Sequence, residues 1–307
     1  MNTYHEYIES KRIAFNPESI VRESPLNDAL FDFQKKIVTW ALARGRAAIF
    51  ADCGLGKTLM QLEWASHVPG DVLILTPLAV ARQTEQEAIK FGIDASISRD
   101  GTKTSQITIT NYEQLHKFNI GSFKGIVLDE SSILKSYTGK IRNAIIDAAS
   151  SVSFRLACTA TPAPNDHMEL GNHAEFIGAM SRVEMLSTFF VHDGGDTAKW
   201  RLKGHARGEF WRWISTWAVA IRTPADMGCS ALGYELPPMN VVEHLADSDF
   251  EQEGVLFPVA MSLSDQRAAR RASMDNRVKI VSDLCNESND QWLVWCELNA
   301  EGDALAS

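Results

Sequence analysis

The sequence has no long apolar run and no paired cysteines, and each absence argues against a class of protein. No stretch approaches the roughly twenty apolar residues of a membrane-spanning helix. The first residues lack the basic-then-apolar order of a secretion signal. The five cysteines are scattered without a Cys-x-x-Cys pair, and the eight histidines show no metal-ligand spacing. We therefore expect a soluble cytoplasmic protein with neither disulfides nor zinc, and no membrane partner.

Positive charge is also scarce, since the net charge is −9. A protein that coats nucleic acid by charge alone is therefore disfavoured, although a local basic track on the surface is still compatible with this balance. The 307 residues are enough for one large or two ordinary domains with a sizeable core.

A glycine-rich string at 51–58, Ala-Asp-Cys-Gly-Leu-Gly-Lys-Thr, lies between a predicted strand and a predicted helix. The residues at 46–51 form a short apolar run, and those at 58–65 have helical spacing. This order predicts a phosphate-binding loop whose backbone N–H groups point at phosphate oxygens. We expect Lys57 to reach the β- and γ-phosphates of ATP, and the Thr58 hydroxyl to bind Mg²⁺. The other residues expected at the nucleotide are Cys53, Gly54, Leu55 and Gly56.

Two adjacent carboxylates, Asp129 and Glu130, end another apolar run at 125–129. Acidic side chains at the carboxyl end of a parallel strand lie in the crevice where nucleotides bind. Asp129 is expected to hold Mg²⁺, and Glu130 to polarise an attacking water. The pair favours hydrolysis over transfer to a second substrate, which disfavours a kinase. Taken alone, two carboxylates at a strand end are equally typical of an ordinary turn.

Apolar runs alternate with helical spacing through the first half of the chain. Strands are expected at 47–51, 72–76, 106–110, 125–129 and 154–158, with helices at 30–42, 79–91 and 139–149. This alternation predicts an α/β fold in which helices cover both faces of a parallel sheet.

Further motifs resemble a known family. Thr159-Ala-Thr-Pro162 follows a predicted strand, and Asn165 and Glu169-Leu170 come after it. With Arg222-Thr223 and Glu235–Pro238, these strings are similar to those of superfamily two helicase-like ATPases of the Swi/Snf-like type. The opening segment also resembles the DEAD/DEAH-type helicases of phages and prophages. The resemblance implies a RecA-like P-loop NTPase domain that acts as an ATP-dependent translocase or helicase on nucleic acid, with duplex DNA favoured.

The resemblance also implies residue roles. Gln34 is expected to read adenine, because an amide can donate to and accept from that base at once. Thr159 and Thr161 would couple hydrolysis to movement. The residues expected to contact the nucleic-acid backbone here are Thr76, Pro77, Thr110 and Asn111. Threonine at a strand end is also common as a helix cap.

Two departures from the family pattern stand out. Ser131-Ser132 replaces the usual Ala-His or Gly-His after the acid pair, and Ser132 is expected to bond Thr159 or Thr161 instead. Family members carry two RecA-like domains, whereas only 291–296 reads as the first strand of a second one. We expect an N-terminal arm at 1–26, a first RecA-like domain at 27–180, a Trp/Arg-rich helical insert and linker at 181–245, and an incomplete second domain at 246–307. Weak ATPase activity is expected, with the remainder supplied by a longer chain or a partner protein.

The Trp/Arg-rich insert allows two interpretations. Arginines such as Arg207 and Arg212 interleave with aromatic residues, an arrangement that can grip and stack nucleic acid. Alternatively, a helix over 209–221 buries its aromatic face and leaves the basic side in solvent. Two alternatives to a translocase also stand: a non-catalytic nucleotide-binding fragment, and an ATP-dependent nucleoprotein remodeller that separates no strands.

Overall fold

The computed structural model describes residues 17–135, 139–193, 196–235, 237–248 and 262–306. Most of the expected N-terminal arm lies outside these ranges. The chain divides into two units, Met1–Glu235 and Leu236–Ser307, and each is described by itself. Within the described residues, no helix combines the length and apolarity that crossing a membrane requires.

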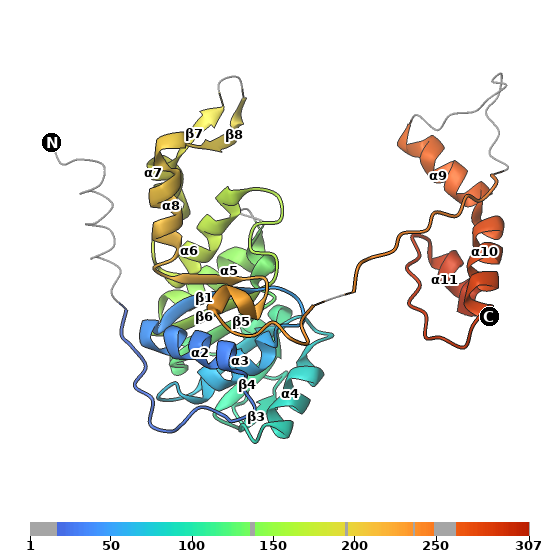
Figure 1. Cartoon of the computed structure of the whole chain (residues 1–307). Helices are drawn as coiled ribbons and strands as arrows, with labels where there is room; N and C mark the ends of the chain where they lie inside the picture. Colours follow the sequence, from blue (N-terminus) through green and yellow to red (C-terminus); the bar gives the residue numbers. More distant parts are fainter. Residues whose placement is uncertain (1–16, 136–138, 194–195, 236, 249–261, 307) are drawn as a thin grey trace. The chain divides into compact units, whose positions relative to one another are not determined.

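The first unit is built on a seven-stranded parallel sheet, which confirms the predicted α/β class (Figure 1). The strands, in chain order, are β1 (Arg46–Ala51), β2 (Val72–Thr76), β3 (Ala95–Ile97), β4 (Ile107–Asn111), β5 (Gly125–Asp129), β6 (Phe154–Thr159) and β9 (Ala218–Ile221). Their spatial order is β3-β4-β2-β5-β6-β1-β9. The central strands are buried along their whole length, which is why they read as continuous apolar runs.

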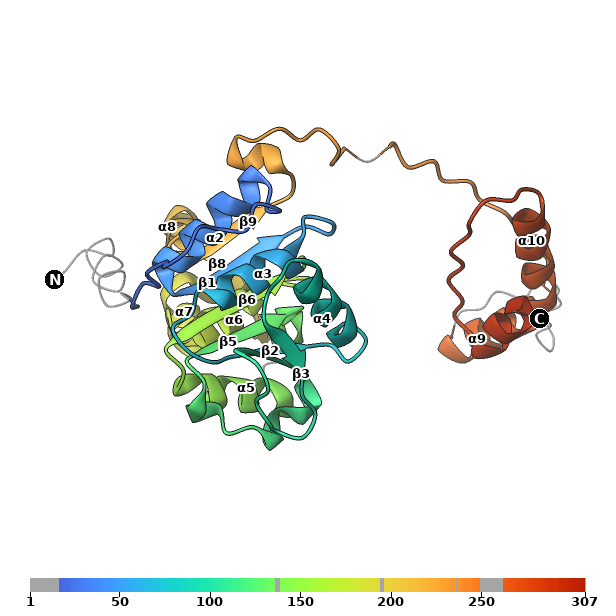
Figure 2. The same cartoon turned by 90° about the horizontal axis from the view of Figure 1, so that it is seen from below.

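Helices cover both faces of this sheet (Figure 2). The face with α2 (Asp32–Arg44), α3 (Lys57–Ser66) and α4 (Ala81–Lys90) packs against one core cluster. The opposite face packs against α5 (Lys140–Ser150), α6 (Leu170–Ile177), α7 (Arg182–Phe189) and α8 (Arg207–Ile214). Successive strand residues serve the two clusters in turn: Val72 and Ile74 join the first, and Leu73 and Leu75 the second.

The Trp/Arg-rich segment differs from the helix expected over 209–221. The helix ends at Ile214, and β9 follows, hydrogen-bonded in parallel to β1. The sheet therefore continues past residue 180, where the first domain was expected to end. Phe210, Trp213 and Trp217 are buried, as the core interpretation of the aromatic residues predicted. Ahead of α8, β7 (Phe190–Asp193) and β8 (Asp196–Leu202) form an antiparallel hairpin that the sequence reading missed.

The second unit contains α9 (Leu263–Ala272), α10 (Met274–Asn286) and α11 (Asn299–Ala306). Arg277 on α10 bonds Glu301 on α11, which ties these two helices together. The strand expected at 291–296 is wrong: these residues form neither helix nor strand, and Trp295 is 88% exposed. A strand requires a hydrogen-bonding partner, and no strand occurs among the residues described within 237–306.

Candidate functional site

The glycine-rich loop joins β1 to the start of α3, in the order that the sequence predicted. Gly54 and Gly56 have φ of 79° and 72°, a left-handed conformation that glycine adopts without strain. Gly56 is the N-cap of α3, so the free N–H groups of the first helical turn face the loop. Lys57 Nζ donates to the carbonyl oxygens of Ala51 and Asp52, at 3.0 and 3.3 Å. The ammonium group is therefore held over the loop.

Gln34 on α2 is buried against this loop. Its Oε1 accepts from the Phe31 N–H at 2.9 Å, and its Nε2 donates to the Leu55 carbonyl at 3.0 Å. The side chain is only 3% exposed. One amide hydrogen and one oxygen lone pair are left over, and these are the groups with which Gln34 could read adenine.

The acid pair lies close to the loop. Asp129 ends β5, and its register partner on β6 is Cys158, which is also the register partner of Ile49 on β1. The Tyr112 hydroxyl donates to the Asp129 carbonyl at 2.5 Å. The glycine-rich loop and the acid pair therefore lie at the carboxyl ends of β1 and β5, which are separated by the single strand β6.

The electrostatics of Asp129 are dominated by burial. The residue is 4% exposed, and this burial raises the pKa of its carboxyl to about 6. The Gln61 amide and the Lys57 charge oppose the rise in pKa, whereas the Glu130 charge adds to it. Gln61 is fully buried on α3, and hydrogen bonding from its side chain is what lowers the pKa of Asp129. Sequence reasoning missed Gln61, because a polar residue on a helix ordinarily faces solvent.

The arrangement of donors suits a magnesium nucleotide. The buried carboxylate of Asp129 and the ammonium group of Lys57 interact, and Thr58 follows Lys57 in the first turn of α3. A methyl group in place of the Gly54 hydrogen would touch nothing within 4 Å, so the loop is open on that side. Asp129 and Thr58 carry side-chain oxygen atoms, the kind of ligand that Mg²⁺ prefers. Among the described residues, no cluster of histidine, cysteine and acidic side chains forms an alternative metal site.

The predicted coupling residues stand next to Glu130. Thr159 Oγ1 donates to Glu130 Oε2 at 3.4 Å and accepts from the Thr161 N–H at 3.1 Å. The partner expected for these threonines was Ser132. Ser132 is half-buried, and its hydroxyl makes no hydrogen bond to the described residues. The loop at 159–161 bonds to Glu130 instead, through Thr159.

The residues predicted to contact nucleic acid differ in exposure: those near the ends of β2 and β4 are buried or half-buried, and the two arginines on α8 are exposed. Thr76 ends β2, and Thr110 lies one residue before the end of β4. Both residues are buried, and the Thr76 hydroxyl donates to the Pro77 carbonyl at 3.1 Å. Asn111 is 6% exposed and donates to Glu113, and Pro77 is half-buried. Arg207 and Arg212 are exposed on α8, where Arg212 pairs with Glu209.

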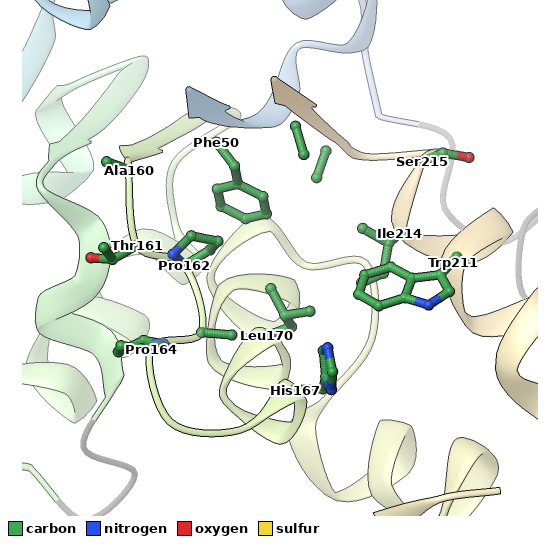
Figure 3. A pocket seen from close by; sticks show the side chains of 13 residues that line it. Phe50, Ala160, Thr161, Pro162, Pro164, His167, Leu170, Trp211, Ile214 and Ser215 are labelled. Atoms are coloured by element: carbon green, nitrogen blue, oxygen red, sulfur yellow. The ribbon is translucent and has the colours of Figure 1, made fainter. Parts of the chain in front are cut away.

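A largely apolar pocket of about 640 Å³ opens beside the loop that follows β6 (Figure 3). Phe50 from β1, Leu170 from α6 and Trp211 from α8 line it. Trp211 is 40% exposed, and its ring meets the ring of His167 edge-on at 5.3 Å. The pocket also reaches Thr161, so it borders the loop at 159–161.

Similar chains are found among solved structures. The SWI2/SNF2 ATPase core of Sulfolobus solfataricus, solved in complex with dsDNA, is similar with a TM-score of 0.55 and 23% identity. The match covers 67% of this chain and 47% of that one. This chain has the fold of the SWI2/SNF2 ATPase core. It thus spans about half the length of that SWI2/SNF2 chain.

Two further solved structures are more distantly similar. The UvsW helicase of bacteriophage T4 has a TM-score of 0.41 at 16% identity, over 58% of this chain and 64% of that one. The Hef helicase domain of Pyrococcus furiosus has a TM-score of 0.40 at 15% identity, over 48% of this chain and 35% of that one. No protein-family model and no curated protein matches the chain.

Proposed function

We propose that this chain binds Mg·ATP and hydrolyses it, and that nucleic-acid backbone, with duplex DNA favoured, stimulates the hydrolysis. The observation that carries the proposal is the convergence of the glycine-rich loop and the acid pair. The loop follows β1 and Asp129 ends β5, and β6 alone lies between these two strands, so we infer that Lys57 and Asp129 share one metal-bound polyphosphate. Glu130, beside Asp129, is the base that polarises water.

The fold supports the same conclusion. The similar SWI2/SNF2 ATPase core was solved in complex with dsDNA. Thr159 contacts Glu130, so a movement of the loop at 159–161 would reach the catalytic carboxylate. We infer that this loop couples hydrolysis to movement along the backbone of the nucleic acid. Contacts to phosphates carry little sequence information, so selectivity for base sequence should be low.

Two substitutions test the hydrolysis directly. Lys57→Ala removes the ammonium group and should abolish productive nucleotide binding. Glu130→Gln should retain ATP binding but stall hydrolysis, since the amide cannot accept the proton of the water. Binding is measured with a fluorescent ATP analogue, and hydrolysis as phosphate release with and without duplex DNA. Normal hydrolysis by Glu130→Gln would remove Glu130 from the role of base.

Gln34 tests the choice of nucleotide. Gln34→Ala should weaken ATP relative to GTP, because a free amide donor and acceptor suit adenine. The same change also removes the bond to Leu55, so a general loss of both nucleotides would indicate a role in loop support instead.

A non-catalytic nucleotide-binding module is the second candidate. The observation that favours this candidate is that the match covers only 47% of the similar SWI2/SNF2 chain. It predicts ATP binding with negligible turnover, whatever DNA is added. Robust DNA-stimulated turnover by residues 1–307 would exclude this second candidate and would also contradict our expectation that an essential half is supplied elsewhere.

A further inference from the structure

Glu130 has an unusual backbone conformation. Its φ of 50° makes it the one non-glycine residue with positive φ among the residues that the structure describes. A side chain with a Cβ adopts this left-handed region at a steric cost, so the surroundings must hold it there. The residues on both sides of Glu130 are held by buried side chains.

On the N-terminal side, the buried Tyr112 hydroxyl donates to the carbonyl of Asp129. On the C-terminal side, the Ser131 hydroxyl forms a 3.1 Å hydrogen bond with His173 Nε2. Ser131 is fully buried and His173 is 1% exposed, so both bonds are shielded from water.

His173 is itself fixed in place. It lies on α6, which follows the coupling loop, and its ring packs edge-on against Phe50 at 5.2 Å. Phe50 belongs to β1, next to the strand end that leads into the glycine-rich loop. Burial lowers the pKa of His173 to about 4, although hydrogen bonding to the backbone of Glu169 and Ser131 opposes this. The imidazole is therefore neutral near pH 7 and works as an uncharged partner.

We propose that Tyr112 and His173 are positioning residues that hold Glu130 in its left-handed conformation, His173 acting through Ser131. The inference rests on the proposed hydrolysis of ATP. With both flanking residues held, the Glu130 carboxylate stays beside Thr159. If either bond is lost, the backbone at 130 relaxes to negative φ and carries the carboxylate away from the attacking water.

The test compares hydrolysis with nucleotide binding in the full chain. Single-turnover hydrolysis is measured with protein in excess over ATP, and the Kd with a fluorescent ATP analogue. Ser131→Ala, His173→Leu and Tyr112→Phe should lower the hydrolysis rate constant on the order of ten- to a hundredfold through misplacement of the base, at unchanged Kd. His173→Gln should keep the wild-type rate, because its amide reaches the position of Nε2. His116→Leu, on an exposed histidine, is the matched control.

Several outcomes would overturn the proposal. A wild-type hydrolysis rate constant in Ser131→Ala and Tyr112→Phe does so. An equal loss of hydrolysis rate in His173→Gln and His173→Leu also does so, because it indicates that His173 acts through packing. If His173→Leu does not fold, Ser131→Ala and Tyr112→Phe decide. Crystal structures of these two variants give a readout that needs no activity: the φ of residue 130 should turn negative. If wild type neither binds nor hydrolyses ATP, the proposed function fails, whereas retention of positive φ in both variants refutes the positioning role alone.

Discussion

Asp129→Asn should stabilise the metal-free protein, even though it removes a ligand of the proposed Mg²⁺ site. Burial raises the pKa of the Asp129 carboxyl from the ordinary value of 3.8 to about 6. The folded state therefore holds the proton more tightly than the unfolded state does. As pH rises from 3.8 to about 6, the unfolded chain ionises first, and the free energy of unfolding falls. Above that range the carboxylate is charged in both states, and the loss in stability is complete.

The size of the effect follows from the two pKa values. Each unit of pKa difference between the folded and unfolded states changes the free energy of unfolding by about 1.4 kcal/mol. The rise from 3.8 to about 6 therefore lowers the free energy of unfolding of wild type by about 3 kcal/mol at pH 8. At pH 4.5 the folded state is still protonated, and the free energy of unfolding of wild type is lowered by only about 1 kcal/mol. Asparagine cannot ionise, so Asp129→Asn should exceed wild type by these amounts. For a domain of this size, the gap at pH 8 corresponds to about 6–12 °C in Tm.

Thermal and urea unfolding in the presence of EDTA measure this gap, with Asp147→Asn as the matched control on the exposed side of α5. The control should leave stability unchanged at both pH values. Addition of Mg·ATP should narrow or reverse the gap, because only wild type gains the binding energy of the metal. The reasoning is refuted if Asp129→Asn is no more stable than wild type at pH 8, or if the gap is the same at pH 4.5.

Three further changes probe the loop, the acid pair and the core. Gly56→Ala should lower the free energy of unfolding by about 1–2 kcal/mol and weaken nucleotide binding. The reason is that φ is 72° and the new methyl group would clash with the Gln34 amide. Urea unfolding measures the stability, and ATP titration measures the binding. Glu130→Gly should raise the free energy of unfolding by about 1 kcal/mol while hydrolysis is lost, and a less stable variant would argue against strain at this position. Trp217→Ala should cost about 3–5 kcal/mol, measured by urea unfolding, because the side chain is fully buried.

The five inner strands of the parallel sheet could be predicted from sequence because they are buried on both faces, whereas the outer strands β3 and β9 are partly exposed and were missed. Each inner strand therefore reads as a short apolar run, and the five expected strands correspond to β1, β2, β4, β5 and β6. The glycine-rich loop was equally accessible, since its geometry depends on neighbours in sequence. Local patterns thus identify the groups proposed to bind ATP. They do not test the roles of those groups.

The rest depends on contacts that no local pattern encodes. His173 meets Ser131 across 42 positions, and no spacing rule connects them. The strand β9 was missed because Phe210, Trp213 and Trp217 continue a helical period past the end of α8. Pairing with β1 overrides that period. At 291–296 the error is the reverse: the apolar run has the composition of a strand, but Trp292 and Leu293 are 53% and 79% exposed and unpaired.

Two separate lines of reasoning meet at Glu130. Sequence reasoning selects it as the base because a second carboxylate after Asp129, the proposed Mg²⁺ ligand, is suited to activating water and not a second substrate. Backbone geometry selects it without reference to chemistry, because it has a conformation that glutamate avoids. A residue without a function at this position would be replaced by glycine at a gain in stability. Strain that is kept at a carboxylate, and held from both sides by buried hydrogen bonds, therefore argues that the orientation of this side chain matters.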